Sequence, residues 1–301
     1  MKLRFLRNTV SYERKKSLYG YGFISIWIVG FITFFIRPMI MVFRYSYSKI
    51  VYLDNGYRLD YLGFGAYIQA LREDSEYIRL LVESFQSLLF NVPIIVAVSL
   101  IIATILNQNF KGRTFYRAIF FIPVIVASGI VISILKGDAI AQVMLNGQKS
   151  SAMFKVTGLQ QIMNEMDFPT QLTGLLTSAA NSVFDLLWKS GIQILLFLAG
   201  LKTIPASIFE ASSIEGATGW DNFWKITIPM VSPMILLTII YTIIDSFTDY
   251  NNSLMIKIIQ SANNMDVTYS SAMSLIYFTF IILFVGIVYV LIDKKVFYQV
   301  D

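Results

Sequence analysis

Ionisable side chains interrupt several otherwise apolar stretches of this sequence, and they are the residues there with the greatest capacity for chemistry. Asp185 and Lys189 lie four residues apart, and Asp245 and Asp249 repeat that spacing. Side chains four residues apart share one face of a helix, where opposite charges can pair. A charge within a membrane helix costs about 2.5–3.5 kcal/mol on insertion scales and usually faces an interior path. The pattern therefore indicates a polar path between membrane helices.

The composition shows which elements must position these groups. Of the 301 residues, 56% are hydrophobic and 14% are charged, whereas a soluble domain carries about 25% charged residues. A helix crosses the hydrocarbon core, about 30 Å thick, with about 20 residues. Six segments are long and apolar enough to do so: 19–36, 84–106, 115–135, 173–201, 230–250 and 270–292. We therefore predict an all-α integral membrane protein with six transmembrane helices.

The charged residues predict the orientation of these helices. Lys and Arg are concentrated in the N-terminal tail and in the shorter loops of one side, and such loops favour the cytoplasm. We therefore expect 1–79 to hold a cytoplasmic tail, the first span and an external loop. The transmembrane core would follow at 80–293, with a cytoplasmic loop at 203–229, and 294–301 would form a cytoplasmic tail.

Residue types that are absent exclude several functions. The chain has no cysteine and no histidine, which excludes disulfides, Cys or His catalysis, and metal sites built from thiolates or imidazoles. The net charge of +5 does not indicate nucleic-acid binding, because the basic residues lie beside the apolar segments and act there as topology signals.

A polar and aromatic island separates the fourth and fifth predicted spans. Thr203 is available to cap a short helix that would run to about residue 215. Gly216 and Gly219 would then break this helix, because glycine accepts backbone angles that other residues avoid. A second short helix, ended by Pro229, would follow with an apolar stripe of Trp220, Phe223 and Trp224. By itself the island fits either a generic interfacial loop or a docking element that transmits force to the flanking helices.

The island resembles the EAA loop of binding-protein-dependent ABC importer permeases, whose pattern is roughly E-A-A-x-x-x-G-A followed by F-x-x-I-x-x-P. The matching residues are Glu210, Ala211, Gly216, Ala217, Phe223, Ile226 and Pro229. Ser212 replaces the usual second Ala, and Glu215 stands where Asp is usual. The similarity covers most of 80–293. The stretches FLAGLKTIP and GRTFYRAIFFIPVIV resemble the maltose-permease-like branch, which imports sugars and oligosaccharides.

This resemblance implies a type I importer permease with a MetI-like core in a bacterial cytoplasmic membrane. The loop would dock as a coupling helix onto a dimer of separate ABC ATPase subunits. A second homologous permease would complete the pore, and an extracellular solute-binding protein would deliver the sugar. The residues expected to couple the ATPase are Glu210, Ala211, Ser212, Glu215, Gly216, Ala217, Phe223 and Pro229.

The chain itself is not expected to be an enzyme or to bind a cofactor. No G-x-x-x-x-G-K-[ST] motif occurs in the sequence, so the loop that cradles ATP phosphates is missing. ATP and Mg²⁺ would be bound by the partner ATPase.

The polar residues of the spans fit a path for a sugar. Carboxylates and amides exchange hydrogen bonds with hydroxyls, and aromatic faces can stack on the C–H surfaces of a pyranose. The candidate path residues are Asn91, Asp185, Trp188, Gln193, Asp245, Asp249, Tyr250 and Asn252. We expect Asp245 to matter more for transport than Asp185. Alternatively, Asp185 and Lys189 form a structural ion pair and 249–252 lie among the outer headgroups.

Other functions remain open at this point. The EAA-type loop indicates coupling to an ATPase and does not identify the transported solute. A polyol, a glycerol phosphate or another small polar solute is therefore an alternative to a sugar. An ion-coupled secondary transporter could use Asp185, Asp245 and Asp249 as ion sites. Such a carrier usually shows repeated halves and paired broken helices, and neither is visible in the sequence.

Overall fold

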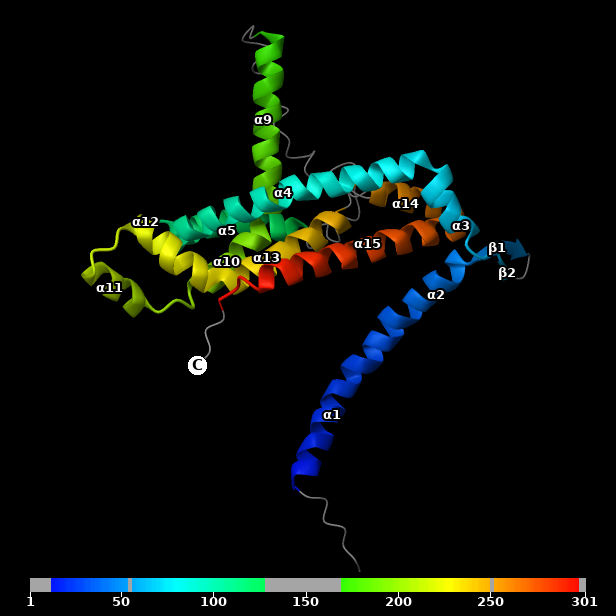
Figure 1. Ribbon diagram of the computed structural model, residues 1–301, viewed down its shortest axis with the longest axis horizontal. Helices are drawn as coiled ribbons and strands as arrows, with labels where there is room; N and C mark the ends of the chain where they lie inside the picture. Colours follow the sequence, from blue (N-terminus) through cyan, green and yellow to red (C-terminus); the bar gives the residue numbers. More distant parts are fainter. Residues whose placement is uncertain (1–11, 54–55, 128–168, 250–251, 298–301) are drawn as a thin grey trace, which may run out of the picture. The chain divides into compact units, whose positions relative to one another are not determined.

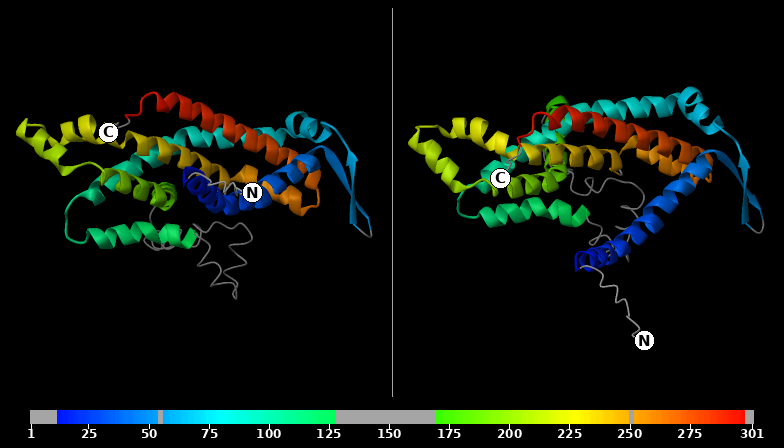
Figure 2. Two further views of the ribbon diagram at one scale, coloured as in Figure 1. Left: turned by 90° about the horizontal axis from the view of Figure 1, so that it is seen from below. Right: turned by 60° about the horizontal axis from the view of Figure 1, so that its bottom comes forward.

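A computed structural model describes residues 12–53, 56–127, 169–249 and 252–297 (Figures 1 and 2). These residues are mostly helical and include one two-stranded β-hairpin. Contacts divide the chain into two compact units, Met1–Ser75 with Gln260–Ile276 and Glu76–Ile259 with Tyr277–Asp301.

The first unit begins with a long apolar helix in three parts. Helix α1 (Tyr12–Phe31) continues through a π-helical segment, η1 (Ile32–Ile36), into α2 (Arg37–Ser46). The sequence predicted an end at residue 36, but the helix continues past Pro38. This is possible because Pro38 lies in the first turn after the π-helical segment, where a missing N–H is tolerated.

A β-hairpin follows α2, where the sequence predicted only an external loop (Figure 2). Strands β1 (Ser48–Leu53) and β2 (Gly56–Tyr61) pair antiparallel, with Ser48 opposite Tyr61. Helix α3 (Gly65–Ile68) and the π-helical segment η2 (Gln69–Glu73) complete the connection.

Polar contacts attach the second part of this unit to the first. The Thr268 hydroxyl donates a hydrogen bond to the Ser48 carbonyl at 2.8 Å. The Tyr269 hydroxyl donates to the Asp74 carboxylate at 2.5 Å. These contacts hold the start of the last long helix beside the hairpin and the segment after η2.

The second unit contains most of the remaining helices. Their bounds are α4 (Ser75–Asn107), α5 (Arg113–Ala127), α9 (Thr170–Lys189), α10 (Gly191–Leu201), α11 (Ala206–Ile214), α12 (Gly219–Asp221), the π-helical η4 (Asn222–Thr227), α13 (Ile228–Thr248), α14 (Ser253–Asn263) and α15 (Val267–Asp293). Helices α14 and α15 begin or end in the first unit. Helix α4 begins before residue 84, so it takes in the end of the predicted external loop.

Helices α10 and α13 pack closely in the core of this unit. Ile194 and Phe197 of α10 are fully buried, as is Val231 of α13. A Cβ atom added to Gly200 would lie 2.5 Å from Cγ of Met234, so only glycine permits this approach.

Four helices of the described chain are long and apolar enough to cross a membrane. They are Tyr19–Ser46, Ser75–Asn107, Gly219–Thr248 and Val267–Asp293. The pair Leu172–Lys189 and Gly191–Leu201, bent by 52°, can form a fifth span (Figure 1). The third predicted span, 115–135, begins in α5 and passes beyond the described residues after 127. The count of six therefore stays a prediction.

Candidate functional site

The cytoplasmic island predicted at 203–229 forms a helix, a turn and a second helix. Helix α11 starts after Pro205, which has extended backbone angles and supplies no side-chain cap. The predicted cap at Thr203 is wrong. Its hydroxyl donates instead to the Gly200 carbonyl at 2.8 Å, because Thr203 lies in the turn that ends α10.

Gly216 ends α11, as the sequence predicted. Its φ of 78° lies in the left-handed region that favours glycine. The Gly216 N–H donates to the Ser213 carbonyl at 3.1 Å, and the Ala217 N–H donates to the Ser212 carbonyl at 3.0 Å. These two hydrogen bonds form a Schellman motif, which satisfies carbonyls left free at a helix end. Backbone hydrogen bonds therefore fix the turn.

The second helix starts with a capping box. The Asp221 N–H donates to the Thr218 hydroxyl at 3.2 Å, and the Thr218 N–H donates to the Asp221 carboxylate at 3.2 Å. Lys225 then pairs with Asp221 at 2.7 Å. Gly219 is the first residue of this helix and does not break one. The predicted break at Gly219 is therefore wrong, because the capping box starts the second helix at this residue.

Pro229 does not end the second helix, so this prediction is also wrong. Residues Gly219–Thr248 form one continuous helix. The π-helical η4 directly precedes Pro229, and the Ile228 N–H donates to Phe223. A wider π turn leaves room for a proline ring that would clash in a regular helix. The second helix of the island and the apolar helix that follows it are therefore continuous.

Apolar side chains project from this island. Trp220 and Trp224 have ring centroids 5.7 Å apart, and Phe223 joins them at 5.3 Å from Trp224. The predicted aromatic stripe is therefore a cluster. Ile214, which the sequence analysis did not select, is 88% exposed. The sequence gives one signal for it: Ile214 is an apolar residue among polar ones, two positions before the glycine that ends the helix.

The expected coupling residues differ in their exposure. Glu210, Ala211, Glu215 and Gly216 are exposed, so they are available to a partner. Ser212 is buried, and its hydroxyl donates to the Phe209 carbonyl at 2.8 Å. Ser212 thus makes its hydrogen bond within α11. The half-buried residues are Ala217, Phe223 and Pro229.

A polar cavity of about 620 Å³ lies in the second unit. Its volume falls within the range of small-molecule sites, about 300–1,000 Å³. Most of its lining residues carry a serine hydroxyl, a side-chain amide or a charged group. These are Glu83, Ser84, Ser87 and Asn91 of α4, Ser182, Asp185 and Lys189 of α9, Ser246 of α13, and Asp249, Asn252 and Ser253.

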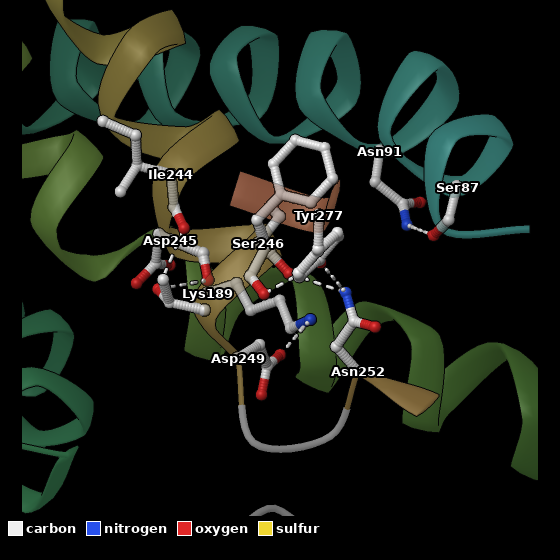
Figure 3. A network of polar contacts seen from close by, with 11 residues as sticks. Ser87, Asn91, Lys189, Ile244, Asp245, Ser246, Asp249, Asn252 and Tyr277 are labelled. Carbon is white, nitrogen blue, oxygen red and sulfur yellow. Dashed lines mark hydrogen bonds and ion pairs between the residues drawn. The ribbon is translucent and has the colours of Figure 1, made fainter. Parts of the chain in front are cut away.

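An ion pair crosses this cavity (Figure 3). The Lys189 ammonium lies 2.7 Å from the Asp249 carboxylate. The sequence offered Asp185 as the partner of Lys189, and the structure corrects this. Lys189 is the last residue of α9, so the bend before α10 places it beside the end of α13. Asp185 has no ion-pair or hydrogen-bond partner among the described residues and remains available on the cavity wall.

Asn252 joins several elements at the edge of the cavity (Figure 3). Its amide donates to the Tyr277 hydroxyl at 2.9 Å. Its carbonyl oxygen accepts from the Ser84 hydroxyl at 3.2 Å and from the Leu254 N–H at 3.0 Å. The Tyr277 hydroxyl donates to the Phe247 carbonyl at 3.0 Å. Asn252 therefore caps α14 and positions the cavity walls.

Comparison with known proteins shows the family to which the chain belongs. No family model matches the chain. The probable ABC transporter permease protein YesP of Bacillus subtilis (strain 168) is 30% identical over 244 residues, which cover 81% of this chain and 75% of YesP. The chain belongs to the ABC transporter permease family. The permease is also 27% identical over 241 residues to the multiple sugar-binding transport system permease protein MsmF of Streptococcus mutans, with 77% and 76% of the two chains covered.

A solved structure confirms the fold of the permease. A chain of a bacterial alginate ABC transporter, crystallised in complex with an alginate pentasaccharide-bound periplasmic protein, superposes with a TM-score of 0.62. The match covers 92% of the permease and 94% of that chain at 15% identity. The predicted all-α, multi-pass membrane fold of an importer permease is therefore confirmed.

The structure places the predicted path residues of the permease in two groups. The residues that line the cavity are Asn91, Asp185, Asp249 and Asn252. Asn91 donates to the Ser87 hydroxyl at 2.8 Å on the same wall. Tyr250 lies outside the described residues.

Three other predicted path residues do not line this cavity. Gln193 is 1% exposed and donates to the Thr242 hydroxyl at 3.3 Å, so it serves helix packing. Trp188 packs against Phe184 with ring centroids 5.6 Å apart. Asp245 is half-buried on α13. The serines that line the cavity were missed, because isolated serines in apolar segments give no signal that distinguishes a path from a helix contact.

No group of three or more Asp or Glu side chains in the described part of the permease could hold a metal ion. The polar lining of the cavity offers hydrogen-bond donors, acceptors and charged groups.

Proposed function

We propose that this permease is the membrane-spanning subunit of an ATP-driven importer for a sugar or oligosaccharide. An external solute-binding protein delivers the cargo, a second permease completes the path, and a dimer of separate ATPase subunits hydrolyses ATP with Mg²⁺. The termini and the 203–229 island face the cytoplasm.

The observation that carries this proposal is the continuous helix Gly219–Thr248. At about 1.5 Å per residue, it extends about 45 Å. It starts at the capped turn beside α11 and ends at Asp249, which pairs with Lys189 across the cavity. A displacement of the island by an ATPase would therefore reach the cavity wall through one rigid element.

The lining of the cavity supports a hydroxyl-rich cargo. Serine hydroxyls, the Asn91 amide and the Asp185 carboxylate, which has no partner within the described part of the chain, offer donors and acceptors that match sugar hydroxyls. The sugar-binding system named for the relative MsmF points to the same class. A polyol or glycerol phosphate is the alternative cargo, since it would use many of the same hydrogen bonds.

Reconstitution tests the proposal. The permease, its partner permease and the ATPase are placed in vesicles with the solute-binding protein, and uptake and ATP hydrolysis are measured for a panel of sugars, polyols and glycerol phosphate. We expect ATP-dependent uptake of a sugar. Uptake that survives inactivation of the ATPase would instead indicate an ion-coupled carrier.

Charge reversal on the island tests the coupling separately. Glu210→Lys places a cation on the exposed face of α11, and we expect it to reduce the ratio of transport to hydrolysis at least about tenfold, as loss of a charge-assisted contact does. The matched reversal Glu73→Lys in η2 should leave this ratio unchanged. A wild-type ratio in Glu210→Lys would remove that residue from the coupling surface.

A further inference from the structure

A groove of about 730 Å³ lies in the first unit, between α2 and the hairpin. One wall is an apolar stripe of Ile36, Met39, Ile40 and Phe43. Their spacing of i, i+3, i+4 and i+7 keeps them on one face of the helix. The groove is separate from the polar cavity and from the ATPase-coupling island, and neither of those sites explains it.

The other end of the groove is polar. Arg44 lies in the last turn of α2, and Tyr47 and Tyr61 line the groove beside it. Ile36 and Arg44 are separated by roughly 12 Å along the helix. Along α2 the lining therefore changes from apolar side chains to a cation within that distance, and the hairpin adds Ser48, Leu59 and Tyr61.

Arg44 has no carboxylate partner among the described residues. The acid in the strand opposite, Asp60, is already paired with Arg58 at 2.8 Å. The side chain of Arg44 is exposed, so its charge is available to an anion that enters the groove. An arginine fork is well suited to phosphate oxygens.

The groove lies on a helix that can span a membrane, which indicates what kind of anion can reach it. Tyr19–Ser46 is long and apolar enough to span a membrane, and none of its most apolar window is buried by the described chain. Its 28 residues extend about 42 Å, which exceeds the hydrocarbon core of about 30 Å. Arginine and tyrosine at the end of such a span lie at headgroup depth.

We propose that this groove binds an anionic phospholipid, with the headgroup phosphate on Arg44 and an acyl chain along Ile36, Met39, Ile40 and Phe43. The lengthwise change from apolar to cationic lining matches a lipid, whose tail and phosphate are arranged in the same order. A helix of a partner subunit would cover the apolar wall but would also have to place a carboxylate against Arg44, whereas an anionic phospholipid carries both groups.

Lipid binding to the purified full transporter tests this proposal. Phosphatidylglycerol and phosphatidylcholine are titrated into delipidated complex, and bound lipid is counted by native mass spectrometry. Soluble glycerol phosphate is the headgroup without the tail. We expect tight binding of phosphatidylglycerol, weaker binding of phosphatidylcholine and no displacement of phosphatidylglycerol by glycerol phosphate, which would leave the lipid in place even if it bound in the polar cavity as cargo. Displacement of phosphatidylglycerol by an equal concentration of glycerol phosphate would overturn the acyl part of the site.

Two arginines of the same helix make a matched pair of variants. Arg44→Gln should weaken phosphatidylglycerol binding roughly fivefold, the effect of one basic residue at an anionic surface. Arg37→Gln, at the start of α2 and outside the groove, should not change it. A phospholipid with a photoreactive acyl chain should label the 36–43 segment in the wild type. Equal affinity of Arg44→Gln and wild type, or labelling that avoids 36–43, would overturn the proposal.

The same variants distinguish a protein partner from a lipid. If the groove holds a helix of the second permease, Arg44→Gln or Phe43→Ser would reduce assembly of the complex without changing lipid affinity, and this result would contradict a lipid site. The proposal does not depend on the transported cargo, so a failure to transport sugar leaves it intact.

Discussion

Asp185 and Asp245 are both carboxylates within apolar helices, but their surroundings differ. Asp185 lies on the wall of the polar cavity and has no partner among the described residues. Asp245 lies on α13 and is not part of that wall. The sequence ranked Asp245 above Asp185 by its depth in the membrane, and the geometry favours the opposite order.

We expect Asp185→Asn to reduce transport roughly tenfold, because the amide oxygen accepts a hydrogen bond from a cargo hydroxyl without the negative charge that strengthens it. Asp245→Asn should have a smaller effect. Both substitutions keep the shape of the side chain, and ATP-dependent uptake in vesicles measures them. Greater loss with Asp245→Asn would show that the cargo follows a different face of α13.

Individual path residues could be predicted from the sequence only in part. A charged or amide group in a span is conspicuous, and Asn91, Asp185, Asp249 and Asn252 do line one cavity. Their partners could not be predicted. Pairing of Lys189 with Asp249 depends on a bend between α9 and α10. The bend follows Lys189 at Ser190 and Gly191, and such a pair can mark a kink but does not give its direction.

Among the elements, too, the sequence predicted one part of the island and missed another. The glycine-terminated helix was predictable, since a positive φ at Gly216 is what glycine provides. The continuation of the second helix through Pro229 was not, because a π-helical segment has no sequence signature comparable to a cap. The hairpin at 48–61 was missed although the sequence carries its signal. Asn55 and Gly56, a pair typical of tight hairpin turns, separate two stretches rich in Tyr, Ile, Val and Leu.

Substitution of the turn tests the role of the Schellman motif. Gly216→Val should destabilise the island by about 1–2 kcal/mol, because a β-branched residue is strained at positive φ, and should reduce coupled ATP hydrolysis. Gly219→Ala is the matched control, since Gly219 is helical and its added Cβ meets nothing within 4 Å. Equal coupling in Gly216→Val and Gly219→Ala would mean that the turn geometry is not required.

The close approach of α10 and α13 gives a stability prediction. Gly200→Ala should lower the unfolding temperature of the permease in detergent, because its Cβ would overlap Met234 and overpacking costs about 1–3 kcal/mol. Adding Met234→Ala should restore part of the loss. Gly174→Ala, where the added Cβ meets nothing within 4 Å, should be neutral or stabilising. An unchanged unfolding temperature in Gly200→Ala would show that the two helices can separate at no cost.

At the scale of the whole molecule, one long helix connects the exposed island, which we propose to face the cytoplasm, to the polar cavity. Family membership follows from the resemblance to relatives over most of the chain, and the sequence alone was sufficient to suggest it. The connection itself required the structure, because it depends on the continuity of Gly219–Thr248 and on the ion pair at its far end.

The most direct test of this connection is a crosslink from the island to the ATPase. The chain has no native cysteine, so Ile214→Cys introduces a single thiol at a side chain that is 88% exposed. A short thiol-to-amine reagent should join it to the ATPase subunit, and the yield should change with ATP. Tyr57→Cys on the hairpin should give no ATPase product and should react with an impermeant reagent outside intact cells. Labelling of Ile214→Cys from outside, or no ATPase product, would contradict the account.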